Sequence, residues 1–154
     1  MRAEDLFHTG IVVDDVESTL RWFTDTAGYQ WCRELAGEHE VQTAHGRQVV
    51  PLRVVPSMNE PRLEIVQAVP DTLWVPADAG VHHIGYWVDD VGEGVARLVA
   101  NGLHVEVTAL SAVGPPLWAY CKGSSGLRIE LVSRSVEPAM REWFADGGSF
   151  FYAR

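Results

Sequence analysis

Two histidines and two glutamates occupy equivalent positions in the two halves of this 154-residue sequence, and together they could bind a metal ion. His8 and His83 each begin a His-x-Gly segment, whereas Glu64 and Glu130 each lie between apolar residues. Imidazole nitrogens and carboxylate oxygens form a mixed ligand set that suits a first-row divalent ion. A carboxylate inside an apolar strand is also costly to bury without a counter-charge. The alternative is that all four are ordinary strand residues on a solvated sheet face.

The equivalence of these positions comes from an internal repeat. Residues 8–16 (HTGIVVDDV) and residues 83–91 (HIGYWVDDV) share an Asp-Asp pair and are offset by 75 residues at every matching position. A repeat of this length is about half a small domain, so it predicts a duplicated supersecondary unit whose halves bury one core together. We therefore expect a single domain over 1–154, with module one at about 1–75 and module two at about 76–154.

The composition excludes several classes of protein. A net charge of −9 argues against a nucleic-acid or anionic-membrane surface, because both require clustered Lys and Arg. No apolar run approaches the length of a membrane span, and the N-terminus lacks the apolar core of a signal peptide, so we expect a cytoplasmic protein. Cys32 and Cys121 form neither a disulfide framework nor a CxxC metal motif.

The elements that must position the four residues alternate between helix and strand patterns. Helices are predicted over 16–27 and 91–101, with Asp15 and Asp90 as N-caps and Gly28 and Gly102 as terminators. Strands are predicted near 29–35, 39–45, 47–56 and 62–68 in module one, with turns near Gly37 and residues 45–46. In module two they are predicted near 104–109, 117–122 and 127–133. Residues 69–80 read as a linker and 135–144 as a closing helix, followed by an aromatic tail at 149–152 that we expect to be packed.

Strand alternation places the polar residues away from the helices. Side chains alternate along a strand, so His8, Gly10 and Val12 share one face while Ile11 and Val13 share the face that meets the helix. By the same rule His83, Gly85 and Trp87 oppose Ile84, Tyr86 and Val88, and both glutamates point away from their apolar neighbours. Trp87, Trp118 and Tyr120 have the alternation required to line a concave face, which favours a substrate that is large, flat or aromatic.

These segments resemble the vicinal oxygen chelate superfamily, which includes glyoxalase I, methylmalonyl-CoA epimerase, extradiol dioxygenases and bleomycin-resistance proteins. The strand of His8 with its Asp-Asp pair, residues 82–90 (HHIGYWVDD) and residues 126–132 (GLRIELV) carry the resemblance, which covers nearly the whole chain. It implies an α+β fold of two tandem βαβββ modules that form a curved eight-stranded sheet around a central cavity. It also implies a metal site built from His8, Glu64, His83 and Glu130, with His82 in a structural role.

The resemblance further implies a chemistry. A His/Glu/His/Glu set is similar to that of bacterial glyoxalase I, whereas the epimerases usually have Gln at the position of Glu64. Four protein ligands leave two open positions on a six-coordinate ion (Ni, Co, Zn, Fe(II) or Mn), enough for a substrate that chelates through two neighbouring oxygens. We expect a divalent-metal-dependent lyase or isomerase that enolises a small carbonyl or thioester substrate, with Glu64 or Glu130 moving the proton.

Some segments differ from the family pattern, and other functions stay open. Residues 22–23 (WF), 27–29 (AGY) and 123–126 (GSSG) depart from the glyoxalases, and no set of basic residues suits a glutathione carboxylate. One alternative is a metal-free protein that sequesters a drug-like compound. Another is an iron-dependent ring-cleaving dioxygenase, although such enzymes use three protein ligands. We also expect a homodimer in which Phe150, Phe151 or Tyr152 is buried.

Overall fold

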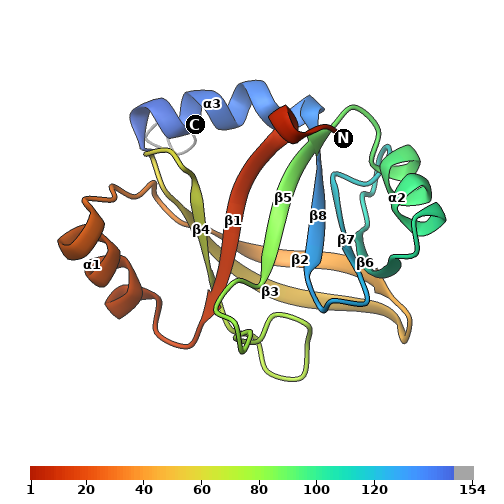
Figure 1. Ribbon diagram of the computed structural model, residues 1–154, viewed down its shortest axis with the longest axis horizontal. Coiled ribbons are helices and arrows are strands. Elements are labelled where there is room, and N and C mark those ends of the chain that lie inside the picture. Colours follow the sequence, from red (N-terminus) through yellow and green to blue (C-terminus); the bar gives the residue numbers. More distant parts are fainter. Residues whose placement is uncertain (148–154) are drawn as a thin grey trace.

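The computed structural model describes residues 1–147, which form eight strands and three α-helices (Figure 1). The helices are α1 (Val16–Ala27), α2 (Val91–Ala100) and α3 (Glu137–Asp146), and two short 3-10 helices are η1 (Ala3–Asp5) and η2 (Arg134–Val136). The strands are β1 (Leu6–Val13), β2 (Leu35–Thr43), β3 (Gly46–Pro56), β4 (Leu63–Gln67), β5 (His83–Val88), β6 (His104–Ala109), β7 (Trp118–Lys122) and β8 (Arg128–Ser133).

All eight strands belong to one closed sheet with the order β1-β4-β3-β2-β6-β7-β8-β5. Each half contributes a strand, a helix and three further strands, and in each half the first strand runs parallel to the last. Antiparallel ladders between β1 and β5 and between β2 and β6 join the halves. The predicted α+β class, with two βαβββ modules in a curved eight-stranded sheet, is therefore confirmed.

The two repeat helices cover opposite sides of the sheet, and α3 lies across one end of it (Figure 1). Ile11 and Val13 pack into the apolar cluster that contains the residues of α1, and Val88 packs into the cluster that contains those of α2. Asp15 and Asp90 cap these helices by accepting hydrogen bonds from the backbone N–H groups of Ser18 and Glu93, at 2.9 and 2.8 Å. The alternation predicted for both strands is thus confirmed at these positions, and the opposite faces of β1 and β5 point into the barrel.

Two local predictions are wrong. Residues 29–35 were expected to form a strand, but residues 29–34 make only an isolated bridge, between Trp31 and Ser57, and Leu35 begins β2. This segment packs on α1 instead, with Nε1 of Trp31 donating to the carbonyl of Leu20 at 3.2 Å. Gly37 was expected in a turn, yet it lies inside β2 opposite Leu52, because the β2–β3 hairpin pairs without interruption from Leu35 to Thr43.

The segment between the modules does more than connect them. It was expected to be a linker over 69–80, and it turns Trp74 into the barrel, where the side chain is only 2% exposed and packs with Val12, Val66 and Tyr120. The closing helix begins at Glu137, after the 3-10 turn η2, slightly later than the sequence indicates.

Two expectations stay open after the fold is known. Within residues 1–147, none of the helices has the length and hydropathy needed to cross a membrane. Phe150, Phe151 and Tyr152, whose burial was expected, lie outside the described residues. The homodimer stays a prediction; the β2–β6 ladder that closes the sheet pairs three residues of β2, at 41–43, with residues 107–109.

Candidate metal centre

The four candidate ligands come from four adjacent strands and form two crossed rows. In one row Glu64 on β4 lies beside Gly10 on β1, which lies beside His83 on β5. In the other row His8 on β1 lies beside Gly85 on β5, which lies beside Glu130 on β8. Each histidine therefore lies beside a glycine of the other module. The strand on the far side of that glycine carries the glutamate. The parallel and antiparallel ladders that join the modules build this arrangement from one chain.

The ligand atoms converge on a small volume. Nε2 of His8 lies 3.0 Å from Nε2 of His83, 2.9 Å from Oε2 of Glu130 and 3.5 Å from Oε2 of Glu64. Nε2 of His83 lies 3.3 Å from Oε2 of Glu64 and 3.5 Å from Oε2 of Glu130. All four residues offer donor atoms within 4.8 Å of one another.

This arrangement fits a divalent metal ion. Donors bound at about 2.0–2.3 Å with tetrahedral or octahedral angles lie about 2.8–3.8 Å apart, and the separations of 2.9–3.5 Å between these side chains fall in that range. The charges agree, because two buried carboxylates need a counter-charge. The cluster is thus compatible with a divalent ion.

The carboxylates also act on the protonation of His8. Burial alone would lower the pKa of His8, but the charge of Glu64 and the hydrogen bond with Glu130 outweigh burial and raise the pKa. The imidazole of His8 is almost completely buried, with 3% of the residue exposed. In the metal-free cluster the imidazolium form of His8 therefore supplies part of the missing positive charge, and this proton must leave before Nε2 can bind a metal.

His82 fixes the orientation and the tautomer of His83. Nε2 of His82 lies 2.8 Å from the carbonyl oxygen of Leu73, which can only accept, so this nitrogen carries the proton. Burial lowers the pKa of His82 to about 4, so at neutral pH its Nδ1 is an acceptor. Nδ1 of His83, 3.0 Å away, must then donate, which leaves the lone pair of Nε2 of His83 free in the cluster. The structural role expected for His82 is to support a candidate ligand.

An apolar cavity of about 370 Å³ opens above the cluster. His8, Glu64 and Glu130 are in its lining, whereas His83 is completely buried behind them. Its aromatic wall includes Trp118 and Tyr120, as the sequence predicts for a substrate-binding surface. Tyr120 on β7 lies directly opposite Glu130 on β8. Burial, together with the charges of the two glutamates, raises the pKa of Tyr120 far above its usual range. The phenol therefore stays protonated and faces the carboxylate as a donor.

Trp87, the third aromatic residue expected in the substrate site, is not in the described lining of this cavity. The β1–β5 ladder has a bulge between Leu6 and His8, and the ring of Phe7 stacks on Trp87 with 4.0 Å between centroids. Phe7 contributes to the cavity wall, so it lies where Trp87 was expected. A bulge of this kind redirects side chains that simple alternation would place on one face.

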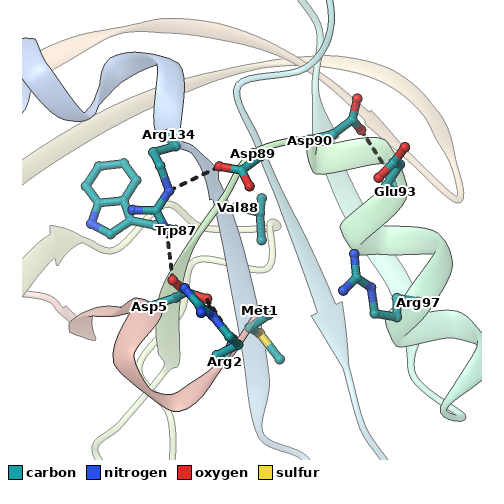
Figure 2. A pocket seen from close by; sticks show the side chains of 10 residues that line it. All are labelled: Met1, Arg2, Asp5, Trp87, Val88, Asp89, Asp90, Glu93, Arg97 and Arg134. Atoms are coloured by element: carbon teal, nitrogen blue, oxygen red, sulfur yellow. Dashed lines mark hydrogen bonds and ion pairs between the residues drawn. The ribbon is translucent and has the colours of Figure 1, made fainter.

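Trp87 instead borders a separate cleft of about 620 Å³ near the N-terminus (Figure 2). The charged side chains there pair with one another: Arg134 lies 2.8 Å from Asp5 and 3.2 Å from Asp89. Asp90 is occupied as the N-cap of α2. This cleft contains none of the four cluster residues, so the smaller, apolar cavity is the candidate site.

Sequence reasoning missed three contributors to the site. Gly10 and Gly85 leave space for the two imidazoles, because a Cβ atom at either position would overlap the histidine ring of the neighbouring strand. The signal was present, since both repeats read His-x-Gly. Trp74 also lines the cavity, and its ring meets the ring of Tyr120 edge to face at 6.0 Å. Nothing in the sequence around Trp74 indicated that the linker turns inward.

Comparison with known proteins agrees with this architecture. A methylmalonyl-CoA epimerase solved with methylmalonyl-CoA is 17% identical and superimposes with a TM-score of 0.58, over 84% of this chain and 93% of that chain. The methylmalonyl-CoA epimerase of Mycobacterium tuberculosis is 16% identical, with a TM-score of 0.54 over 88% and 91%. A variant of 4-hydroxymandelate synthase from Streptomyces coelicolor is 20% identical, with a TM-score of 0.53 over 84% of this chain and 38% of that chain.

At these identities the solved structures establish the fold alone. No curated protein sequence matches the chain significantly. The family profile described as Glyoxalase/Bleomycin resistance protein/Dioxygenase superfamily matches residues 7–121. This match includes His8, Glu64 and His83 and covers most of the chain. The chain therefore belongs to the glyoxalase/bleomycin resistance protein/dioxygenase superfamily, also called the vicinal oxygen chelate superfamily.

Proposed function

We propose that this protein is a divalent-metal-dependent isomerase or lyase that enolises a carbonyl substrate with neighbouring oxygen atoms. One observation carries the proposal: two imidazoles and two carboxylates from four strands converge within 4.8 Å at the base of a cavity. The membership in this superfamily and the likeness of the fold to methylmalonyl-CoA epimerases support an isomerase-type reaction. His8, Glu64, His83 and Glu130 would hold the ion.

A divalent ion at this position would polarise the substrate carbonyl and so acidify the adjacent C–H bond. Glu64 is the better candidate for moving the proton. Its side chain is 14% exposed compared with 8% for Glu130, and across the sheet it faces Pro56, which offers no donor. Glu130 faces the hydroxyl group of Tyr120 and lies closer to His8, so it is the more restrained carboxylate.

The proton balance of the step is simple. Glu64, released from the ion, takes the proton from the carbon next to the carbonyl group. The electron pair of the broken C–H bond forms a C=C bond, and the π pair of the C=O bond moves onto the carbonyl oxygen, which gives the enolate. Delivery of a proton to the opposite face of the same carbon, with the electron pair returning from oxygen to re-form the C=O bond, gives epimerisation. In an α-hydroxy carbonyl compound, delivery of the proton to the former carbonyl carbon gives isomerisation, because the hydroxyl proton moves to the former carbonyl oxygen and the hydroxyl oxygen becomes the new carbonyl. Neither outcome requires an oxidant or a co-reactant. The apolar walls limit the access of water to the carboxylate.

The experiment that tests this function has two readings. Protein purified without chelator should contain a divalent metal, or should bind Ni²⁺, Co²⁺, Zn²⁺, Mn²⁺ or Fe²⁺ in a titration. In D₂O, the metal-loaded protein should exchange the hydrogen next to the carbonyl in at least one member of a panel of α-hydroxy ketones, hemithioacetals and acyl-CoA esters. Glu64→Gln should remove most exchange while retaining measurable ligand affinity. Glu38→Gln, on the exposed part of β2, is the matched control and should exchange normally.

Two other results would replace this proposal. Tight binding of small molecules without exchange, insensitive to Glu64→Gln and Glu130→Gln, would indicate a sequestering protein whose ligand is held by the cavity walls. Consumption of oxygen by the Fe²⁺-loaded protein with a catechol would indicate a dioxygenase. The cavity by itself favours neither, because both of these functions also need an apolar binding site.

A further inference from the structure

The cavity above the cluster has walls that are almost entirely apolar, and they come from both modules and from α3. Leu52, Val54 and Val66 form the side contributed by module one, and Val132 lies on the side of module two. Met140 and Trp143 of α3 complete the lining. The polar groups of the cluster are thus confined to one end of an otherwise apolar cavity.

No lysine or arginine is present among the described residues that line this cavity, its opening included. The only charged side chains in the lining other than His8 are Glu64 and Glu130, which belong to the cluster. His39 lies at the opening, and burial lowers its pKa, so it is neutral at pH 7. A carboxylate or phosphate bound in this cavity would lose its hydration without gaining a cationic partner, which is unfavourable. The exception is a group that reaches the metal position.

The described cations that stand next to lining residues in the sequence, Arg53 and Arg141, are paired with carboxylates. His39 on β2 has acidic neighbours on both sides, Glu38 and Glu40, and the whole chain carries a net charge of −9. Arg53 forms ion pairs with Glu17 and Glu34, with 2.6 Å between a guanidinium nitrogen and a carboxylate oxygen in each pair. A polyanionic group such as the nucleotide end of coenzyme A would meet electrostatic repulsion here.

Aromatic side chains form one wall. The rings of Trp74, Trp118 and Tyr120 meet edge to face, with centroids 5.7–6.1 Å apart. Such a group presents ring faces and edges at which a further aromatic ring packs favourably. The volume of about 370 Å³ is near the lower limit for small-molecule sites, so it fits a one- or two-ring compound.

From these features we infer that the substrate is an uncharged aromatic α-hydroxy carbonyl compound, and that acyl-CoA esters and glutathione adducts are excluded by charge. The ring would lie against Trp74 and Trp118, and the two adjacent oxygens would face the cluster. This inference depends on the proposed function for the reaction, but its substrate class follows from the cavity walls. The inference adds a rule for substrate recognition. The cavity selects against anionic substrates because its described lining has no lysine or arginine, and it favours aromatic substrates because one wall is aromatic.

The test is a binding experiment by calorimetry, with and without Zn²⁺, that compares four probes. 2-Hydroxyacetophenone has the ring and both oxygens, hydroxyacetone lacks the ring, phenylglyoxylate adds a carboxylate, and propionyl-CoA adds phosphates. Burial of a phenyl ring should make 2-hydroxyacetophenone bind about 10- to 100-fold more tightly than hydroxyacetone. Propionyl-CoA should bind more weakly than 2-hydroxyacetophenone. Tighter binding of propionyl-CoA, or equal binding of the two hydroxy ketones, would overturn the inference.

Two variants sharpen the result. Trp118→Ala should remove most of the advantage of the phenyl probe, whereas Trp22→Ala, at a position that is 59% exposed on α1, should leave it unchanged. Leu117→Arg adds a cation to the lining at a position that is 43% exposed, so that the guanidinium group stays in contact with solvent. That variant should gain affinity for phenylglyoxylate and propionyl-CoA relative to the neutral probe. An unchanged order of affinities in Leu117→Arg would contradict selection by charge.

Failure of the inference and failure of the proposed function give different patterns. Deuterium exchange with acyl-CoA esters, combined with weak binding of 2-hydroxyacetophenone, would overturn the substrate class and leave the enolisation standing. Tight binding of 2-hydroxyacetophenone without any exchange would leave the recognition rule standing and refute the enolisation.

Discussion

The imidazole of His83 lies over the Cα atom of Gly10 on the neighbouring strand, in the space that a side chain at position 10 would fill. The repeat produces the mirror relationship between His8 and Gly85. Each histidine can lean across the next strand toward the cluster only because that strand has a glycine at the crossing point. The His-x-Gly repeat therefore encodes both the candidate ligands and the space they need.

Replacement of either glycine should remove metal binding. In Gly10→Ala the new methyl group would displace His83, and we expect loss of most metal affinity together with a destabilisation of about 1–3 kcal/mol from overpacking. Gly37→Ala is the matched control, because no atom of the described chain lies within 4 Å of a Cβ built at this strand glycine. Metal titration and urea unfolding measure both effects. Wild-type metal affinity in Gly10→Ala would show that His83 is not a ligand.

Loss of the hydrogen bond from His82 should weaken metal binding without removing a ligand. His82→Phe deletes the acceptor that holds Nδ1 of His83, and changes of this kind typically reduce metal affinity about 10- to 100-fold. His82→Asn retains an acceptor and should recover part of the loss. His104→Phe, at an exposed position on β6, serves as the control. An affinity for Zn²⁺ that is equal in His82→Phe and the wild type would refute the role of His82.

Metal binding should release a proton at low pH. The carboxylates raise the pKa of His8, despite burial, in the metal-free protein, and the metal requires the neutral imidazole. Below this raised pKa the apparent affinity should therefore fall about tenfold per pH unit, and it should level off above it. Calorimetry in buffers with different ionisation enthalpies counts the protons. Glu130→Gln should reduce the number released at a given pH, and binding without proton release below pH 6 would contradict the assignment.

The stability of the metal-free protein should fall as the pH drops from about 6.5 to 5. Burial lowers the pKa of His82 to about 4 and that of His83 to about 3, so in this range both stay neutral in the folded chain. The unfolded chain takes up one proton at each, which favours unfolding by up to about 1.4 kcal/mol per pH unit for each histidine. His8 opposes this slope near pH 6.5, because its folded pKa is raised whereas the unfolded histidine, with a pKa of about 6.5, is only half protonated there. Towards pH 5 both states are protonated, and His8 adds little slope.

Urea unfolding in EDTA at several pH values measures this dependence. The slope in His82→Phe should be smaller than in the wild type, because one of the two histidines that take up protons on unfolding is gone. A stability that is constant between pH 6.5 and 5 in the wild type would show that the two buried histidines are not held neutral by the fold.

The amino-acid sequence by itself determined the repeat and the capped helices, and its resemblance to a known superfamily predicted the fold class. These features depend on local information: the offset of 75 residues, the N-cap residues Asp15 and Asp90, and the alternation that directs Ile11 and Val13 to the helix. The same alternation selected His8, Glu64, His83 and Glu130 as a set on one side of the sheet, and the structure brings their donor atoms together.

Only the tertiary structure decided how these residues meet. The register of the β1–β5 ladder places each histidine over a glycine of the other module, and Phe7, at the bulge in that ladder, lines the cavity and stacks on Trp87, which does not. The carbonyl of Leu73 in the linker orients His82, and Trp74 from the same segment fills the barrel. Ladder register, bulges and inward turns of a linker result from contacts between residues distant in the chain, because side-chain periodicity fixes which face a residue occupies but not which residue lies across from it.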